Sequence, residues 1–485
     1  MGEFGYTSQF PRVLRRFALF AIAFSIVSIT TGIFLNYSYG ITQLGPAAVW
    51  LWPVAVVGQL LVVLVLAELA GHMPLAGANY QWAARLVNTR FGYVVGSLGV
   101  LYGAVGLPGI ALLGLAPLAA TVFGLDPEST RLTLFVAVLA LVVAYLVNIV
   151  RVQLAARVNN VAVFAEIIGT VVLSVVVFVA WVRGGDAAPV PHGFGFLSTT
   201  ATSAPLTDAI VGGALIGIFT LVGFEAAADM AEEAVDARRS VPRAMLLSVI
   251  VSGVLGMAAL IGFTLAIPDL AAIQASSVPL ADIAGYWLGP VLTKVFLAIV
   301  VFSMFALVVV AAASNSRLIF AMARDGLLPG SGLLRRVNAR TGTPVAALVA
   351  SLVVCLVLMA YGTLDGDAFG VLVGATALVP YLVYLLTLGG YLARRRRLLA
   401  LGDGGFSLGA AALPVAGLAM LWLVAVVASL TVPDAFREAD YVVLAALALA
   451  GIWYVAVLRR RLRDGTAGLG TGEADHPDRV PEEAS

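Results

Sequence analysis

Two carboxyl side chains, Glu166 and Glu225, lie inside apolar stretches that are long enough to cross a lipid bilayer. Ionisable residues at membrane depth are costly, and they are functional candidates by default. A buried carboxyl group suits a residue that binds and releases protons, so both are candidates for proton coupling or gating. For Glu166, the alternative is an ion pair with an arginine such as Arg157 or Arg317. For Glu225, the alternative is a carboxylate that accepts hydrogen bonds from free backbone amides.

One apolar stretch, residues 21–40, has the run Thr30-Thr31-Gly32 in its middle. Helix propensity falls there, and hydroxyl groups can replace lost backbone hydrogen bonds. In lipid, an unwound turn is tolerated only where it is buried in protein or lines a wet cavity. Such a break leaves amides and carbonyls free for a small charged ligand. The alternative is a continuous helix packed closely on a neighbour.

A second weak stretch, residues 212–225, contains four glycines together with Phe219 and Thr220. An aromatic ring inside a break can cover a bound substrate or stack on a cation, so Phe219 is a candidate gate, with ordinary packing as the alternative. Weakened segments at matching places in two halves of a chain are the sequence pattern of an inverted-repeat transporter.

The composition identifies an integral membrane protein. Of 485 residues, 61% are hydrophobic and 11% are charged, whereas soluble domains are about half apolar and a quarter charged. The net charge of +1 indicates no nucleic-acid partner. The single cysteine, Cys355, lies in an apolar run, so we expect no disulfide framework, no cysteine-based metal site and no cofactor. A phosphate-binding GxxxxGK[ST] loop is absent from the sequence, which argues against direct ATP coupling.

A membrane-spanning helix needs about 20 apolar residues, and this rule gives about twelve spans. They cover roughly residues 17–42, 47–70, 93–122, 130–150, 158–183, 208–231, 243–267, 289–323, 343–361, 367–393, 408–430 and 440–460. Arginines gather at alternate ends of these spans, which places both termini in the cytoplasm of a plasma-membrane protein. The cytoplasmic loop Ala231–Met245 predicts a solvated charged face, with Ser240 as the cap of the next helix.

The first and sixth spans carry the breaks, which suggests two repeats of five spans. The expected organisation is a cytoplasmic N-terminus (1–16), a first repeat (17–183), a second repeat (208–393), two further spans (408–460) and a disordered cytoplasmic tail (464–485).

Five motifs carry a resemblance to a known family. They are TTGIF, GPAAVWLWPVAVVGQ, ELAGHMPLAGANYQWA, GFEAAADMAEEAVDARRSVPRAM and SNSRLIFAMARDGLLP. In this order and topology the chain, from about residue 12 to 460, resembles the amino acid–polyamine–organocation transporter superfamily. The likeness is closest to its amino acid/choline permease branch. The resemblance implies an all-α fold of the leucine-transporter type, with 5+5 inverted repeats and broken first and sixth helices.

The resemblance also implies roles for residues of the two breaks. The substrate carboxylate would bind the amides of Thr30, Thr31 and Gly32, where a helix N-terminus favours an anion. The substrate amine would meet carbonyls around the breaks, and the full set of expected substrate-binding residues is Ser28, Ile29, Thr30, Thr31, Gly32, Phe219, Thr220, Val222 and Gly223.

The same resemblance places Glu225 on the family's glutamate after the sixth-span glycine. Glu166 falls near a position where some proton-coupled relatives carry a lysine, so the glutamate is a departure, and the coupling ion stays open between proton and sodium. Two threonines in the first break narrow the pocket, which favours a small or extended substrate such as GABA.

The sequence therefore predicts a secondary transporter of an amino acid or related amine that works by alternating access and is driven by protons. Alternative substrates are choline, a polyamine or a basic amino acid, and sodium coupling or exchange are alternative modes. Outside transport, the alternatives are a nutrient receptor or a channel on the same fold. A membrane enzyme is disfavoured because the apolar runs contain no histidine and no Ser–His combination.

Overall fold

The computed structural model of the chain describes residues 2–7, 9–183, 193–202, 205–276, 278–364, 366–402, 404–432 and 437–470. The helices of the first half are α1 (Arg16–Val27), α2 (Ile29–Leu44), α3 (Leu51–His72), α4 (Ala78–Leu86), α5 (Thr89–Gly109), α6 (Ala116–Phe123), α7 (Thr130–Val150) and α8 (Val152–Arg183). Those of the second half are α9 (Leu206–Thr220), α10 (Ala226–Asp229), α11 (Ala237–Leu265), α12 (Leu270–Ala275), α13 (Pro279–Arg324), α14 (Ser331–Leu334), α15 (Val345–Leu364), α16 (Gly366–Leu399), α17 (Ala412–Thr431), α18 (Arg437–Trp453) and α19 (Arg459–Arg463).

Eleven helical segments of the described chain are long and apolar enough to cross a membrane. The shorter apolar helix α9 lies where the sixth span was predicted, and it is short because the chain leaves the helix after Thr220. An all-α polytopic membrane protein with about twelve spans is therefore confirmed. The relation of the two halves as inverted repeats, and the domain boundaries drawn from it, stay predictions.

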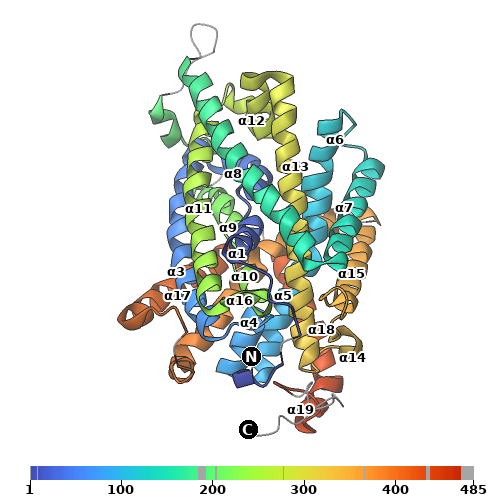
Figure 1. Cartoon of the computed structure of the whole chain (residues 1–485). Coiled ribbons are helices and arrows are strands. Elements are labelled where there is room, and N and C mark those ends of the chain that lie inside the picture. Colours follow the sequence, from blue (N-terminus) through green and yellow to red (C-terminus); the bar gives the residue numbers. More distant parts are fainter. Residues whose placement is uncertain are drawn as a thin grey trace.

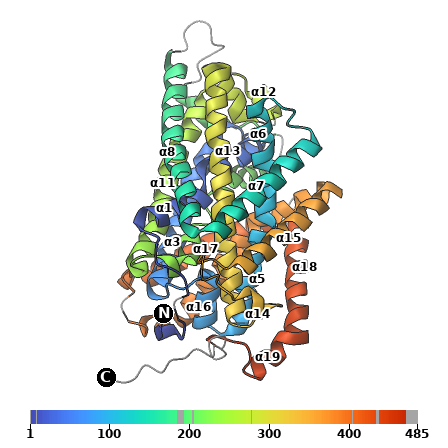
Figure 2. The ribbon, with the colours of Figure 1, turned by 45° about the vertical axis from the view of Figure 1, so that its right-hand side comes forward.

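The half-helices α1, α9 and α10 lie in the middle of the bundle, with the long helices around them (Figure 1). Helix α2 packs along α9, and α1 packs against α8, α11 and α13. Helix α18 lies at the edge of the bundle, as the turned view shows (Figure 2). The interrupted segments are thus enclosed by protein, which is where non-helical backbone is tolerated at membrane depth.

Helix α5 presents a face of glycines to α13. Glycines at 92, 96, 99, 103 and 106 recur every three or four residues, which puts them on one side of the helix. A methyl group added at Gly96, Gly99 or Gly103 would come within 2.7, 2.7 and 2.4 Å of side-chain atoms on α13. The absence of side chains on this face lets the two helices approach closely.

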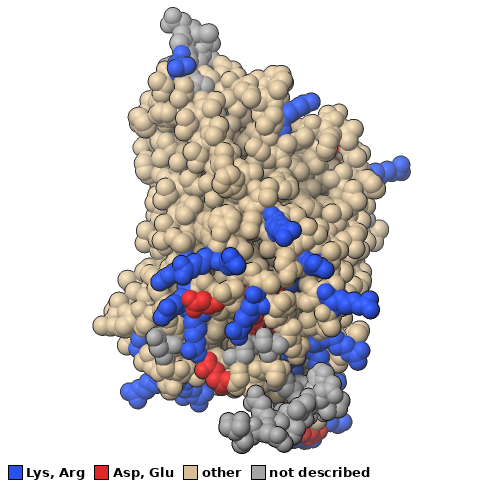
Figure 3. All heavy atoms as spheres, viewed as in Figure 1, with Lys and Arg blue, Asp and Glu red and all other residues tan. Residues whose placement is uncertain are grey.

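Charged side chains concentrate on one half of the molecule. In the space-filling view, most of the visible Lys and Arg lie on the lower half, where helix α19 is also found (Figures 1 and 3). This asymmetry agrees with the alternation of arginines along the sequence.

The N-terminal segment, residues 2–7 and 9–15, docks on the lower half of the bundle. Its main chain pairs with the segment after α10, since the amides of Val13 and Leu14 both lie 2.9 Å from the carbonyl oxygen of Glu233. The hydroxyl of Tyr6 donates to Asp325 at 2.8 Å. The ring of Phe10 packs edge-on against Phe320, with centroids 4.9 Å apart. The segment was expected to be cytoplasmic, but its docking was not predicted.

The predicted disordered tail begins with a stretch that contacts the rest of the chain. The amides of Gly468 and Gly470 donate to the carbonyl and carboxylate oxygens of Asp325 at 2.9 and 3.2 Å. Residues 464–470 thus contact Asp325, whose acceptors the sequence pattern does not reveal, and disorder of the tail stays a prediction. The rest of the predicted tail, 471–485, lies outside the described residues.

Candidate functional site

The first interruption is confined to Ser28. This residue separates α1 from α2 with φ 27° and ψ 91°, a conformation that residues other than glycine rarely adopt. Its side-chain oxygen accepts a hydrogen bond from the amide of Thr31 at 3.2 Å, as serine does at helix N-termini. The prediction of a break in this span is confirmed, but its predicted position at Thr30-Thr31-Gly32 is wrong. Those residues form the first turn of α2, because Ser28 caps it.

Glu166 of α8 completes this cap. One carboxylate oxygen, Oε1, accepts from the amide of Thr30 at 3.1 Å and from its hydroxyl at 2.9 Å. The hydroxyl of Ser28 lies 3.4 Å from the same oxygen. The side chain of Glu166 is buried, and its position at a helix N-terminus suits a negative charge. The described partners of Glu166 are thus Ser28 and Thr30, and the alternative of an ion pair with Arg157 or Arg317 is wrong.

The second interruption is longer. Helix α9 ends at Thr220 and α10 begins at Ala226, with Gly223 at φ 85° between them, in the region that favours glycine. Tyr384 of α16 bridges this turn. Its hydroxyl oxygen accepts from the amide of Gly223 at 2.9 Å, and its hydroxyl donates to Glu225 at 2.5 Å. The predicted break is confirmed here at the predicted residues.

The half-helices α2 and α9 meet at a glycine. A methyl group on Gly32 would lie 2.1 Å from the hydroxyl oxygen of Thr220, so the Thr220 side chain packs directly on the backbone of Gly32. Thr220 directs that hydroxyl to the carbonyl of Ile216 at 2.5 Å. Gly32 thus fixes how closely the two interrupted helices approach.

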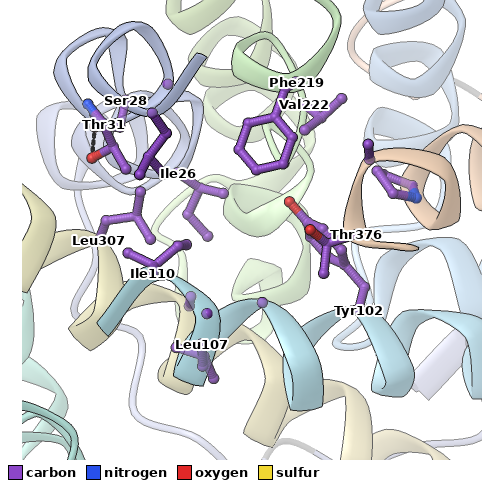
Figure 4. Close-up of a pocket in the computed structure, with 18 of the residues that line it drawn as sticks. Ile26, Ser28, Thr31, Tyr102, Leu107, Ile110, Phe219, Val222, Leu307 and Thr376 are labelled. Carbon is purple, nitrogen blue, oxygen red and sulfur yellow. Dashed lines mark hydrogen bonds between the residues drawn. The ribbon is translucent and has the colours of Figure 1, made fainter. Parts of the chain in front are cut away.

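A cavity of about 740 Å³ lies between the two interruptions. Ser28 and Thr31 lie on one side of it and Phe219 and Val222 on another, with Tyr102 and Thr376 close to Phe219 (Figure 4). The predicted residues that line this cavity are Ser28, Thr31, Gly32, Phe219, Thr220, Val222, Gly223 and Glu225.

Three predicted residues do not line the cavity, namely Ile29, Thr30 and Glu166. The amides of the first turn of α2 are also engaged, since Thr30 donates to Glu166, Thr31 to the Ser28 side chain, and Gly32 to the Ser28 carbonyl at 2.9 Å. A role for these amides in binding a substrate carboxylate stays a prediction.

Several lining residues were missed by the sequence reasoning. Tyr102 and Thr376 come from α5 and α16, while Asn79, Ser314 and Asn315 line the cavity towards α4 and α13. The signal that could have found Tyr102 is the glycine spacing of α5, which marks a face of close approach. Thr376, Ser314 and Asn315 lie in spans whose local sequence carries no break, and Asn79 lies between two predicted spans.

Buried ion pairs close the lower side of the bundle. Arg317 pairs with Glu233 at 2.8 Å, and Arg324 pairs with Glu232 at 3.0 Å, with all four side chains buried. The loop was predicted to present a solvated charged face, which is wrong for these glutamates because arginines of α13 reach them. Ser240 also lies inside α11 rather than at its cap, donating to the carbonyl of Asp236 at 2.8 Å.

The N-terminal segment seals the same side. The guanidinium carbon of Arg324 lies 3.7 Å from the centre of the Tyr6 ring, and that of Arg317 lies 5.7 Å from the centre of the Phe10 ring. A guanidinium over an aromatic face is an attractive contact. Burial raises the pKa of the neighbouring Asp325 carboxyl, although Arg324 and the tyrosine hydroxyls oppose that rise.

Comparison with known proteins points to one family. The family model described as "Amino acid permease" matches residues 14–455. The chain is 25% identical to the amino-acid permease BAT1 of Arabidopsis thaliana over 465 residues, which cover 90% of this chain and 88% of the relative. It is 28% identical to a GABA-specific permease of Saccharomyces cerevisiae over 372 residues, covering 74% and 65%. It is also 25% identical to a thiamine transporter of Schizosaccharomyces pombe over 431 residues, covering 79% and 71%.

Proposed function

Because the chain belongs to the amino acid permease family, we propose that it is a secondary transporter that carries an amino acid or a related amine across the plasma membrane by alternating access. The observation that carries this proposal is the single cavity onto which both interrupted helices open. Interrupted half-helices around a central site are how transporters hold small charged substrates at membrane depth.

The proposed contacts come from both interruptions. Ser28, Thr31 and Gly32 contribute from the first, while Phe219 and Val222 contribute from the second. A substrate ammonium group in this cavity would meet Glu225 and the aromatic face of Phe219. The names of the relatives, an amino-acid permease and a GABA-specific permease among them, support an amino acid or an amine as the substrate class.

The distribution of closed and open surfaces supports alternating access. The cavity lining extends to Pro127 and Glu128, in the loop between α6 and α7 at the end opposite to helix α19 (Figure 1). The other end is closed by the Arg317–Glu233 and Arg324–Glu232 pairs. With the termini in the cytoplasm, as we propose, this arrangement is an outward-facing state whose cytoplasmic side is sealed.

Proton coupling is proposed to act through Glu166. An ionised carboxylate accepts the hydrogen bonds from Thr30 and Ser28 that tie α8 to the first interruption. Protonation weakens it as an acceptor, since hydrogen bonds to charged groups contribute about 1.5–3 kcal/mol and neutral ones about 0.5–1.5 kcal/mol. Binding of a proton would therefore loosen α8 from the break and help the half-helices to move. Glu225, held by Tyr384 at the second break, is the second candidate.

The test is uptake by the purified protein in liposomes. A labelled amino acid, GABA, choline or a polyamine should accumulate under an inward proton gradient, and an uncoupler should abolish the accumulation. Glu166→Gln should retain binding but lose the dependence on the gradient. The exposed residue Glu438 offers a matched control, because Glu438→Gln makes the same chemical change on the surface of α18, outside both interruptions.

Uptake that ignores pH and follows sodium would overturn the proton coupling. Full gradient dependence in both Glu166→Gln and Glu225→Gln would remove both carboxyl groups from that role. Binding without any flux would overturn transport itself in favour of a receptor.

A further inference from the structure

A groove of about 680 Å³ lies apart from the central cavity, where three segments of the chain meet. The N-terminal segment supplies Gln9, Phe10 and Pro11, the junction of α7 and α8 supplies Arg151 and Gln153, and the loop before α15 supplies residues 337–342. We call this recess the junction groove. It shares no lining residue with the central cavity, so it is a separate recess.

The junction groove is held together by contacts between these segments. A methyl group added at Gly342 would lie 3.0 Å from ring atoms of Pro11, so the N-terminal segment packs directly on the backbone of the loop. The hydroxyl of Thr343 lies 3.5 Å from the carbonyl oxygen of Ile149, which ties the same loop to the end of α7. Because the N-terminal segment forms one wall, the groove is complete only while that segment is docked.

The groove carries two positive charges without a compensating negative charge. Arg151 and Arg340 are exposed, and within the described chain neither guanidinium group forms an ion pair or a hydrogen bond. The described lining contains no Asp or Glu. Single arginines at cytoplasmic helix ends are ordinary in membrane proteins. Two of them in one groove without a carboxylate favour an anion, and the guanidinium fork matches the oxygen atoms of a phosphate group.

The groove lies at the ends of three candidate membrane spans, Thr130–Val150, Val152–Arg183 and Val345–Gly362. Helix α14, which precedes the loop, lies on the lower half of the molecule with most of the visible Lys and Arg (Figures 1 and 3). The exposed apolar side chains of Val150 and Leu154 flank the groove residues of the α7–α8 junction. A basic recess at this depth, beside an apolar surface, suits a lipid whose headgroup enters the groove while its acyl chains follow the helices.

We propose that the junction groove binds the phosphate of an anionic phospholipid through Arg151 and Arg340, and that the bound lipid holds the N-terminal segment docked. The leaflet is the cytoplasmic one in the orientation proposed above. The second part follows from linkage, since a ligand that binds only the docked state stabilises that state. Phe10 connects the groove to the closed side, because its ring packs on Phe320 and lies 5.7 Å from the guanidinium carbon of Arg317.

The binding experiment compares two lipids that share their acyl chains. The purified full-length protein in detergent is titrated with dioleoylphosphatidylglycerol, which is anionic, or with dioleoylphosphatidylcholine, which is zwitterionic, and native mass spectrometry gives the affinity of each. An arginine near an anionic lipid surface contributes about fivefold in affinity, so two should make phosphatidylglycerol bind about 25-fold more tightly. Inorganic phosphate is the third probe, and it should leave the unfolding midpoint unchanged where phosphatidylglycerol raises it.

The variants test the assigned arginines. Arg151→Gln with Arg340→Gln should bind the two lipids with affinities within about twofold of each other. The matched control is Arg131→Gln with Arg183→Gln, which removes two exposed arginines from the opposite ends of α7 and α8 and should keep the preference. All four side chains are exposed, so both double variants should fold.

Trypsin cleavage tests the link to docking. Arg12 and Arg15 are exposed in the N-terminal segment, but cleavage after them requires the docked chain to loosen. Phosphatidylglycerol should slow this cleavage at least fivefold in the wild type and should not change it in Arg151→Gln with Arg340→Gln.

Each contrary outcome removes a defined part of the proposal. Equal binding of the two lipids by the wild type would overturn the lipid site. Loss of the preference in the control variant would assign it to overall charge instead of the groove. A midpoint raised equally by inorganic phosphate, and only with both groove arginines present, would make the ligand a soluble phosphate. Tight binding without slower cleavage would overturn the link to docking. Because none of these measurements involves transport, their failure would leave the proposed function untouched.

Discussion

The ion pair between Arg317 and Glu233 makes a sharp prediction about the closed side of the molecule. Both side chains are 1% exposed, and the two atoms that meet are 2.8 Å apart. Removing one partner of a buried pair costs about 3–5 kcal/mol, because the other charge is left without compensation. Arg317→Met should therefore destabilise the closed state by that amount.

The protein can recover part of this penalty by opening and hydrating the orphaned carboxylate. If opening recovers about a third of 4 kcal/mol, the open fraction rises about tenfold, since about 1.4 kcal/mol corresponds to a factor of ten. Replacing both partners by apolar side chains removes both charges, and such replacements are often neutral or stabilising. Arg317→Met with Glu233→Leu should therefore close the site again.

The sole cysteine makes the measurement direct. Cys355 is buried, so Cys355→Ala gives a background without thiols. Leu318→Cys then places one thiol in the cavity lining, next to the pair. A membrane-impermeant thiol reagent applied to the cytoplasmic side should label this site at least tenfold faster with Arg317→Met than without it. The exposed pair Arg463–Asp464 supplies the control, since Arg463→Met should not change the rate.

Unchanged labelling in Arg317→Met, with an unchanged unfolding temperature, would refute the idea that this pair holds the side closed. Fast labelling in the double variant would refute the explanation by an orphaned charge, and would assign the effect to lost packing instead.

Three further predictions concern stability, each measured by thermal unfolding in detergent. Gly32→Ala should lower the free energy of unfolding by about 1–3 kcal/mol through overpacking, because its methyl group would lie 2.1 Å from the Thr220 hydroxyl oxygen. Adding Thr220→Gly should restore part of this loss. Equal unfolding midpoints for wild type and Gly32→Ala would contradict the contact. Burial raises the pKa of the Asp325 carboxyl above its value in the unfolded chain, which is about 3.9. The protonated carboxyl therefore contributes its full share to the free energy of unfolding below about pH 3.9, and this contribution is lost as the pH rises through the raised pKa. Asp325→Asn should therefore flatten the dependence of the unfolding midpoint on pH in that range. The same pH profile in the variant and the wild type would argue that Asp325 does not cause this dependence. Tyr6→Phe removes a donor to the Asp325 carboxylate and should cost about 1.5–3 kcal/mol, whereas no loss would mean that the N-terminal segment is not held by this bond.

The spans and the second interruption were predictable because their causes are local. Apolar length defines a span, and Gly223 has the positive φ that its residue type favours. The first interruption was predicted in the right span but two to four residues too late. Its position depends on Ser28 as a cap and on Glu166, which is 136 residues from Thr30 in sequence. A contact over that separation leaves no mark in local helix propensity.

The buried glutamates show the same limit. Glu232 and Glu233 stand in a run of acidic and basic residues that is typical of a solvated loop. Their partners, Arg324 and Arg317, are 92 and 84 residues away. Only the fold brings these charges together, so sequence reasoning assigned them to solvent. Asp229 also has a partner that only the fold brings close, since Ser314 lies 85 residues further along the chain.

The glycine face of α5 has a consequence for how this protein can change over evolution. A methyl group at Gly103 would lie 2.4 Å from the side chain of Asn315, so neither position can grow unless the other shrinks. Among homologous chains we expect these two positions to vary as a coupled pair, with a larger residue at 103 accompanied by a smaller one at 315. A lineage that makes this exchange would also lose the amide at 315, and with it one polar side chain of the cavity lining.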